Sequence, residues 1–258
     1  MDQRHSVHPL AREEMPLLAA ALGDSPETVI THHLLTSRAC NAWCVGDVRQ
    51  PSAAIVQADA FLAEPMVFGH APEDIARIMP FVQGWDTFSV PRYLAHTLER
   101  TVTTLAGTGA LNTLEDVYHI LDGPIPAFDR QPDVRLLTDD DVLLTAGIEE
   151  LQQSSAYKPI VAAGIVEGEI VSLAHTFAWS PLYVDIGVTT HEDLRNQGYA
   201  TTAAAIVAEE VRKRGRTPVW SCGVHNEPSL RIAQKLGFRE TSRRLYLIPL
   251  IPESRAGE

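Results

Sequence analysis

The stretch VDIGVTTHEDLRNQGYATTAAAIVAEEVRKRG, residues 184–215, decides the fold of this chain. It begins with a β-type run that ends near Thr190 and continues into a helical pattern from Tyr199, with small and apolar residues recurring on one face. Basic residues in the last turn, followed by Gly215, are typical of a helix end. The stretch therefore predicts a strand, a polar loop and a helix in succession.

The junction of this loop and helix, RNQGYAT at residues 195–201, has the composition of an anion site. The first N–H groups of a helix have no partner within it, and together with the helix dipole they attract negative charge. Gly198 allows a close approach or an unusual backbone angle, and Arg195 supplies a fixed positive charge. A glycine before a helix is also an ordinary turn, so this string indicates a pyrophosphate site only with further support.

That support lies about thirty residues further on, where NEPS at residues 226–229 precedes KLGF at residues 235–238. These strings predict a polar turn and a short helix that stops at Gly237, after a strand-like run. With both motifs, the chain resembles the GCN5-related N-acetyltransferase (GNAT) family. The resemblance covers about residues 133–250, and its specific part is 184–238.

The resemblance implies the acyl-CoA N-acyltransferase fold, an α/β (α+β) fold whose mixed, mostly antiparallel central sheet has flanking helices. It also implies acetyl-CoA as co-substrate. The end of the strand would meet the pantetheine arm, the loop and helix start would hold the pyrophosphate, and the NEPS turn would face the cofactor from the other side. The cofactor-binding residues expected on this basis are Val188, Thr189, Thr190, Arg195, Asn196, Gln197, Gly198, Tyr199, Ala200, Thr201, Asn226 and Ser229.

The resemblance further implies direct attack of an amine on the thioester, with a backbone N–H near residues 188–190 stabilising the oxyanion. Many members have a tyrosine as general acid seven residues after the capping Asn226, but Ala233 stands there. Asp185, Tyr183 and His175 are then the candidates for proton transfer. Each also has an ordinary interpretation, as a hydrogen-bonded or core side chain.

Composition excludes several classes of protein. Of 258 residues, 45% are hydrophobic and 21% charged, which is ordinary for a folded chain, and the net charge of −12 disfavours nucleic acid and anionic membranes. No apolar stretch approaches the length of a membrane span, and the N-terminus does not resemble a signal peptide, so we expect a cytoplasmic protein. Three cysteines and scattered histidines predict reduced thiols and no metal site.

Three prolines and a glycine in residues 122–132 predict a linker. We therefore expect an N-terminal mixed α/β domain at 1–121 and a catalytic domain at 133–258. The first half is similar to the degenerate first domain of two-domain GNAT relatives and has no R-x-x-G-x-A equivalent. We expect two similar domains, of which the first shapes the acceptor pocket or an interface.

Two local patterns in the second half make further predictions. Glu167-Gly168-Glu169 separates two apolar runs and predicts an antiparallel hairpin. Thr138, with the acidic residues 139–141, predicts the start of a helix that continues to about Gln153.

The sequence thus predicts an N-acetyltransferase that moves an acetyl group from acetyl-CoA to a primary amine of a small molecule or peptide. Two alternatives stay open. One is a catalytically weak or inactive acetyl-CoA-binding regulatory protein, and the other is a transferase for longer acyl groups. We expect a monomer or homodimer without nucleic-acid or membrane partners.

Overall fold

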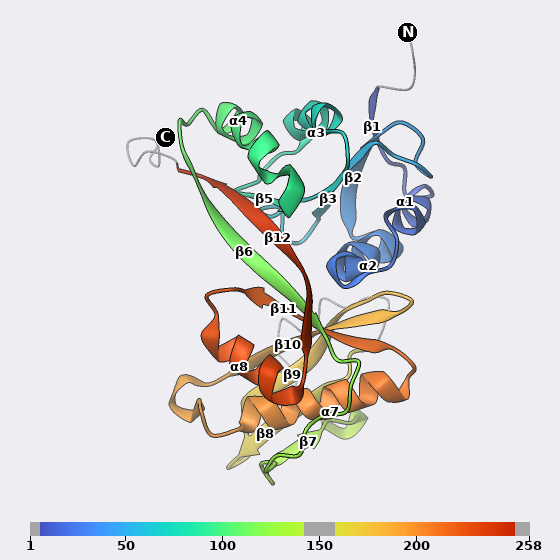
Figure 1. Cartoon of the computed structure of the whole chain (residues 1–258). Helices are drawn as coiled ribbons and strands as arrows, with labels where there is room; N and C mark the ends of the chain where they lie inside the picture. The colour runs from blue at the N-terminus through green and yellow to red at the C-terminus, as the bar shows by residue number, and fades with distance from the viewer. Residues whose placement is uncertain (1–5, 142–157, 251–258) are drawn as a thin grey trace. The chain divides into compact units, whose positions relative to one another are not determined.

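The computed structural model describes residues 6–141 and 158–250 (Figure 1). The chain forms two compact units. The first unit comprises Met1–Gly23, Leu34–Asp116 and Arg243–Glu258, and the second comprises Asp24–His33 and Val117–Ser242, each as far as its residues are described.

The first unit is built on strands that are hydrogen-bonded in the order β1-β2-β3-β4-β5-β12. Short 3₁₀ turns at Met79–Phe81 and Arg92–Leu94 adjoin its helices, and the turn Pro26–Thr28 before α2 lies in the second unit. Helix α2 begins in the second unit and ends in the first. The elements are β1 (Val7–Pro9), α1 (Met15–Leu22), α2 (Val29–Ser37), β2 (Cys40–Val45), β3 (Ala53–Ala58), β4 (Met66–Gly69), α3 (Pro72–Ile78), β5 (Phe88–Pro91), α4 (Ala95–Ala106) and β12 (Arg239–Pro249).

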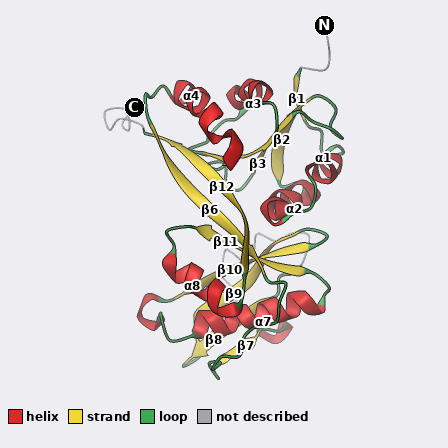
Figure 2. Cartoon of the chain, in the orientation of Figure 1, coloured by secondary structure: helices red, strands yellow, loops and turns green. Residues whose placement is uncertain are grey.

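The described part of the second unit contains strands in the order β6-β11-β10-β9-β8-β7, with the helices α7 and α8 (Figure 2). Short 3₁₀ turns lie at Asp139–Asp141 and Glu192–Leu194. The elements are β6 (Leu111–Ile120), β7 (Val134–Leu136), β8 (Val161–Val166), β9 (Glu169–Trp179), β10 (Tyr183–Thr190), α7 (Tyr199–Lys213), β11 (Thr217–Gly223) and α8 (Glu227–Leu236).

The two units share one strand pattern. In each, four consecutive strands pair antiparallel, and the fourth then pairs parallel with the fifth: β4 with β5 and β10 with β11. A helix connects each parallel pair, α3 in the first unit and α7 in the second. The prediction of a mixed, mostly antiparallel sheet with flanking helices is confirmed, and the shared pattern agrees with two similar domains.

The units differ from the expected boundaries at 121 and 133. Strands β6 and β12 each contribute residues to both units, and the segment Asp24–His33 lies in the second unit. The strand next to β5 therefore comes from the C-terminal end of the chain, and the strand next to β11 comes from before the proline-rich segment. Prolines mark where regular structure stops, but backbone pairing decides which unit a neighbouring strand joins.

Local backbone geometry explains the predicted hairpin. Glu167 and Gly168 have φ of 52° and 87°, so both central residues of the turn between β8 and β9 are in the left-handed region. Such two-residue turns match the twist of antiparallel strands, and the hairpin prediction is confirmed. At the start of the helix predicted from Thr138, the structure has a 3₁₀ turn at Asp139–Asp141; the rest of that prediction, to Gln153, lies outside the described residues.

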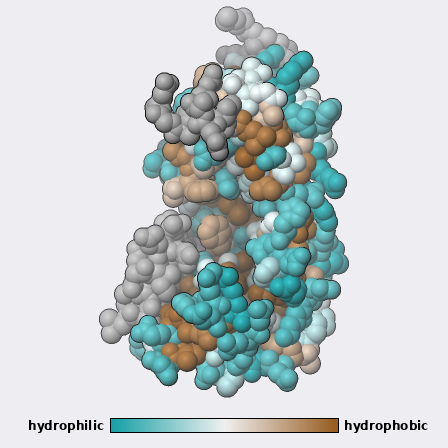
Figure 3. All heavy atoms as spheres, turned by 90° about the vertical axis from the view of Figure 1, so that its left-hand side faces the viewer, coloured by the Kyte–Doolittle hydropathy of each residue, from teal (hydrophilic) through white to brown (hydrophobic). Residues whose placement is uncertain are grey.

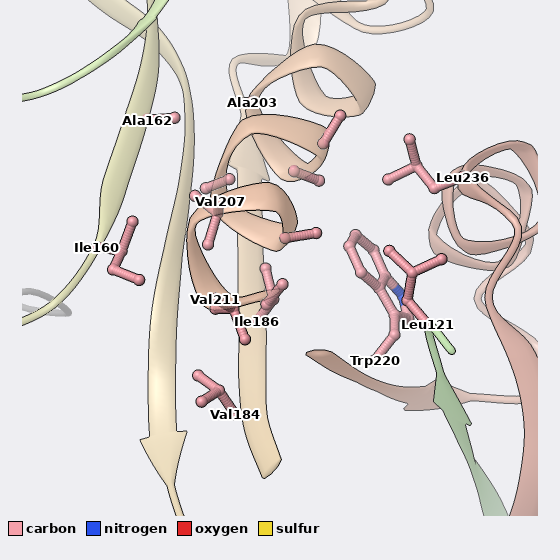
Figure 4. Close-up of a cluster of buried hydrophobic side chains, with 14 of the residues drawn as sticks. Leu121, Ile160, Ala162, Val184, Ile186, Ala203, Val207, Val211, Trp220 and Leu236 are labelled. Carbon is pink, nitrogen blue, oxygen red and sulfur yellow. The ribbon is translucent and has the colours of Figure 1, made fainter. Parts of the chain in front are cut away.

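The core of the second unit forms where α7 packs on the strands (Figure 4). Ala203, Val207 and Val211 are fully buried on one face of the helix. They face apolar side chains of the strands, including Val184 and Ile186 of β10. Small residues let the helix approach the sheet closely, because interiors are packed at crystal-like density.

The face of the molecule drawn in Figure 3 carries both hydrophilic and hydrophobic residues. On the face drawn in Figure 3, hydrophilic and hydrophobic residues alternate over short distances. None of the described helices combines the length and apolar composition needed to cross a bilayer.

Strand β12 completes the first unit, where Leu247 is fully buried against Phe88 and Val90 of β5. We predict that Leu247→Ala lowers the free energy of unfolding by about 2–5 kcal/mol, because it leaves a cavity in a packed core. Denaturant unfolding followed by circular dichroism measures this. Leu250→Ala is the control, since Leu250 is 44% exposed. Equal effects of the two substitutions would contradict the placement of β12.

Candidate functional site

The second unit has a cavity where two parallel strands separate. β10 and β11 pair only at their first residues, Tyr183 with Thr217, Val184 with Pro218 and Asp185 with Val219. On its other side, β10 shifts its register against β9 between Asp185 and Ile186. A cavity of about 760 Å³ opens beyond this point, and its lining begins at Ile186 on β10 and Trp220 on β11.

Most of the expected cofactor residues line this cavity. Its wall is formed by the ends of both strands, the loop before α7, the first turn of α7 and one face of α8. Gln197 lies outside it, where its carbonyl accepts a hydrogen bond from the Gln131 side chain. The expected residues in the lining are Val188, Thr189, Thr190, Arg195, Asn196, Gly198, Tyr199, Ala200, Thr201, Asn226 and Ser229.

The loop before α7 turns its backbone toward the cavity. Asn196 and Gly198 have φ of 63° and 89°, in the left-handed region. The first helical hydrogen bond of α7 runs from the Thr202 N–H to the Gly198 carbonyl, at 3.0 Å. The N–H groups of residues 199–201 therefore precede the helical ladder, and they lie in the cavity wall. This is the geometry with which proteins bind phosphate groups.

Glycine is required at position 198 by backbone conformation rather than by space. A Cβ there would meet Gln131 Cγ at 3.7 Å, an ordinary contact, but the φ of 89° is one that L side chains rarely adopt. Gln131 also supports the helix start, because its N–H donates to Thr202 Oγ1 at 3.0 Å.

Three cationic side chains line the cavity, and sequence reasoning found only Arg195. The Arg195 guanidinium lies 3.4 Å from the Glu192 carboxylate. Arg231 and Lys235 extend from α8, four residues apart and hence on one helix face. That spacing was visible in the sequence, but which face of α8 meets the cavity was not.

Asn226 and Ser229 hold α8 in place while they line the cavity. Asn226 caps the helix, its Oδ1 accepting a hydrogen bond from the Ser229 N–H at 3.2 Å. Ser229 Oγ accepts a hydrogen bond from Trp220 Nε1 at 2.9 Å, which joins α8 to β11. Ala233, where the family tyrosine was expected, is 1% exposed and belongs to the core.

The three candidates for proton transfer do not line the cavity. Tyr183 packs in an apolar cluster with Val219 and other side chains. His175 is buried beneath Gly187, where a Cβ would come within 3.1 Å of the imidazole Cε1. Asp185 is 4% exposed and accepts a hydrogen bond from Ser221, a cavity-lining residue that sequence reasoning missed.

In the first unit, the corresponding strands are bridged by a side chain. β4 and β5 share a single parallel pair, Met66 with Ser89. Arg244 of β12, 2% exposed, donates from Nη2 to the Val67 carbonyl at 2.7 Å and to the Ser89 carbonyl at 2.8 Å. Its Nε donates to Ser89 Oγ at 3.0 Å. A buried guanidinium thus joins β4 and β5, which correspond in the strand pattern to the two strands that separate around the cavity of the second unit.

The start of α3 also differs from that of α7. Only His70 and Ala71 separate β4 from α3, and the His70 N–H donates to the Ser52 carbonyl at 3.1 Å. Pro72 has no N–H, and Asp74 places a carboxylate in the first turn, where Ser52 Oγ donates to it at 2.6 Å. The Asp74 N–H donates to the Ala71 carbonyl at 3.1 Å, and the Asp74 carboxylate places a negative charge where the start of α7 has none.

No group of three or more His, Cys, Asp or Glu side chains within residues 6–141 and 158–250 is placed to hold a metal ion.

Burial raises the pKa of Cys40 to about 12 and that of Cys44 to about 11, so both thiols stay protonated at neutral pH.

Comparison with known proteins agrees with this geometry. Residues 162–244 match the model of a family described as GNAT acetyltransferase. The matched range contains the separating strands, the loop before α7 and helix α8. A comparison with curated protein sequences gives no match.

Solved structures match nearly the whole chain. A GCN5-related N-acetyltransferase-like protein from Streptococcus suis 89/1591 has a TM-score of 0.65 at 20% identity, covering 92% of this chain and 99% of that one. A tandem GNAT protein from the clavulanic acid biosynthesis pathway has a TM-score of 0.58 at 15% identity, with 96% and 99% covered. A GCN5-related N-acetyltransferase from Sphaerobacter thermophilus has a TM-score of 0.56 at 14% identity, with 98% of each chain covered.

At these identities the structures show a common fold, and the sequence match lies in the second unit except for its last two residues, Arg243 and Arg244. Residues 162–244 thus belong to the GNAT acetyltransferase family, in a chain that has the fold of a tandem GNAT protein.

Proposed function

We propose that the chain is an N-acetyltransferase that moves an acetyl group from acetyl-CoA to a primary amine of a small molecule or peptide. The observation that carries the proposal is the cavity between β10 and β11, which runs to the N–H groups at the start of α7. It combines an anion site with an opening between two strands, as an elongated pyrophosphate-bearing thioester requires.

The described residues fit this donor. The N–H groups of residues 199–201 would hold the pyrophosphate, with Arg195, Arg231 and Lys235 around it. These cations matter because the chain carries a net charge of −12, and its overall field opposes a polyanion. The pantetheine arm would follow the edge of β10 that faces the cavity, where β11 no longer pairs with it.

The reaction needs a neutral amine placed against the thioester carbon. The new C–N bond forms as the amine attacks, and the C–S bond breaks when the tetrahedral intermediate collapses. The proton lost by nitrogen ends on the thiolate, giving an amide and free CoA. A backbone N–H at the end of β10 would stabilise the oxyanion. No acyl-enzyme is formed.

One observation favours a second function, that of an acetyl-CoA-binding regulatory protein. Ala233 is buried in the core, so α8 offers no hydroxyl at the position where a tyrosine acid was expected. Thiol release from acetyl-CoA in the presence of amines, amino acids and peptides separates the two functions. Tight binding of acetyl-CoA without amine-stimulated thiol release would favour the regulatory function. The alternative of a transferase for longer acyl groups is tested by comparing transfer from acyl-CoA thioesters of increasing chain length.

Several expectations from the sequence stay predictions. They are the cytoplasmic location, the monomeric or homodimeric state, the lack of nucleic-acid and membrane partners, and the contribution of the first unit to the acceptor pocket or an interface.

We predict that Gly198→Glu weakens CoA binding about 100-fold or more, because it adds backbone strain of about 1–3 kcal/mol and a negative charge beside the anion site. Isothermal titration calorimetry with CoA measures the loss. Gly109→Glu is the matched control, since it adds the same charge at an exposed glycine whose Cβ would meet no atom within 4 Å. Unchanged affinity of Gly198→Glu would remove the basis of the proposal.

We also predict that each chain binds one CoA. Arg244 bridges β4 and β5 in the first unit, and Asp74 lies at the start of α3. Calorimetry should give a stoichiometry of one for the unaltered protein, and Gly198→Glu should leave no site that binds CoA with the original affinity. A second equivalent of CoA, or a site in this variant with the original affinity, would show that the first unit also holds the cofactor.

A further inference from the structure

The inner end of the cavity carries a hydroxyl that is linked to a buried carboxylate. Ser221 stands on β11 two residues beyond Val219, the last residue paired with β10, and it lines the cavity. Asp185, the β10 partner of Val219, does not line the cavity and is 4% exposed. Ser221 therefore lies between the cavity and this carboxylate.

The contact joins the hydroxyl to both carboxylate oxygens. Ser221 Oγ lies 3.4 Å from Asp185 Oδ1 and 3.3 Å from Oδ2. A hydroxyl can donate to a carboxylate while its lone pairs accept from another donor. A protonated group in the cavity can thus donate to Ser221 Oγ while Ser221 donates to Asp185. This arrangement can carry a proton from the cavity to a side chain that does not reach it.

Other hydroxyls of the cavity wall have different partners. Ser229 Oγ accepts the Trp220 indole N–H at 2.9 Å. Thr190 Oγ1 lies 2.8 Å from Ser172 Oγ and 2.9 Å from the Thr189 carbonyl. Ser221 differs from these two because its partner is an acidic side chain that can keep the proton.

We propose that Ser221 is a catalytic residue of the acetyl transfer, and that Asp185 acts through it as the proton acceptor. This inference rests on the proposed function and assigns the group that neutralises the amine. The ammonium N–H bond breaks and its proton moves to Ser221 Oγ, while the Ser221 proton moves to the Asp185 carboxylate. The neutral amine then attacks the thioester carbon, the C–S bond breaks, and the thiolate takes the proton that nitrogen loses. Asp185 returns its proton to solvent through the same hydroxyl.

This assignment explains how the chain can act without a tyrosine on α8. The departing thiolate is protonated from the reacting nitrogen, so Ala233 removes no group that the proton balance needs. The step that requires a protein side chain is removal of the first proton from the ammonium group, and the Ser221–Asp185 pair supplies it.

The experiment compares amines that arrive charged with one that arrives neutral. Acetyl transfer from acetyl-CoA is measured with butylamine, benzylamine and lysine, which are protonated at neutral pH, and with hydroxylamine, which is not. Ser221→Ala should lower kcat for the charged amines about 100-fold or more, the usual contribution of general acid–base catalysis. Its kcat for hydroxylamine, the KM for acetyl-CoA and the Kd for CoA should change little.

Variants at the two positions separate catalysis from folding. Ser221→Thr keeps the hydroxyl and should retain most of the activity, and Asp185→Asn should behave as Ser221→Ala does. The matched control is Ser180→Ala, which removes another serine–aspartate hydrogen bond, from Ser180 Oγ to Asp24 Oδ1 at 2.7 Å, away from the cavity. Thermal melting of each variant shows whether it is folded.

The outcomes distinguish the inference from the proposed function. Undiminished kcat in Ser221→Ala, equal losses for hydroxylamine and the charged amines, or an equal loss in Ser180→Ala would overturn the role of Ser221 alone. If Ser221→Ala does not fold, full activity of Asp185→Asn would overturn it. CoA binding without transfer to any amine by the unaltered protein would overturn the proposed function, and the role of Ser221 with it.

Discussion

The site depends on the early end of pairing between β10 and β11. These parallel strands share three residue pairs and then separate, at the point where β10 also shifts its register against β9. Backbone N–H and C=O groups that lose a strand partner must find another partner. A register shift such as the one between Asp185 and Ile186 also changes the direction in which the residues beyond it point. The start of α7, one face of α8 and Ser221 all face the space that opens there. The proposed anion binding and the proposed proton transfer therefore share one structural cause.

The first unit shows that the strand pattern alone does not make a site. β4 and β5 share even less pairing than β10 and β11, yet the buried guanidinium of Arg244 donates to carbonyls of both strands. Burial of a cation is unfavourable unless its donors are satisfied; the two carbonyls accept from Nη2, and Ser89 Oγ accepts from Nε. The same topology thus leads to a cavity in one unit and to two strands joined by a buried guanidinium in the other. The two units differ in the Arg244 side chain and in the length of the loop before the helix, which in the first unit is only His70 and Ala71.

Features set by neighbouring residues were predictable. The glycine with positive φ before α7, the Asn226 cap and the hairpin at Glu167-Gly168 each depend on local backbone geometry, and the expected residues other than Gln197 line the cavity. Ser221 was missed because its link to Asp185 crosses between strands that are 36 positions apart in the chain. Arg231 and Lys235 were missed because helical periodicity identifies a face but not what that face meets.

By itself, the sequence determined the strand, loop and helix order of residues 184–238 and the positive φ at Gly198, because caps, glycines and periodicity act over a few residues. Only the tertiary structure decided which strands complete each unit, which candidate groups reach the cavity and which side chain joins β4 to β5. Strand register and burial depend on partners distant in the chain, as β12 beside β5 and Arg244 between β4 and β5 show.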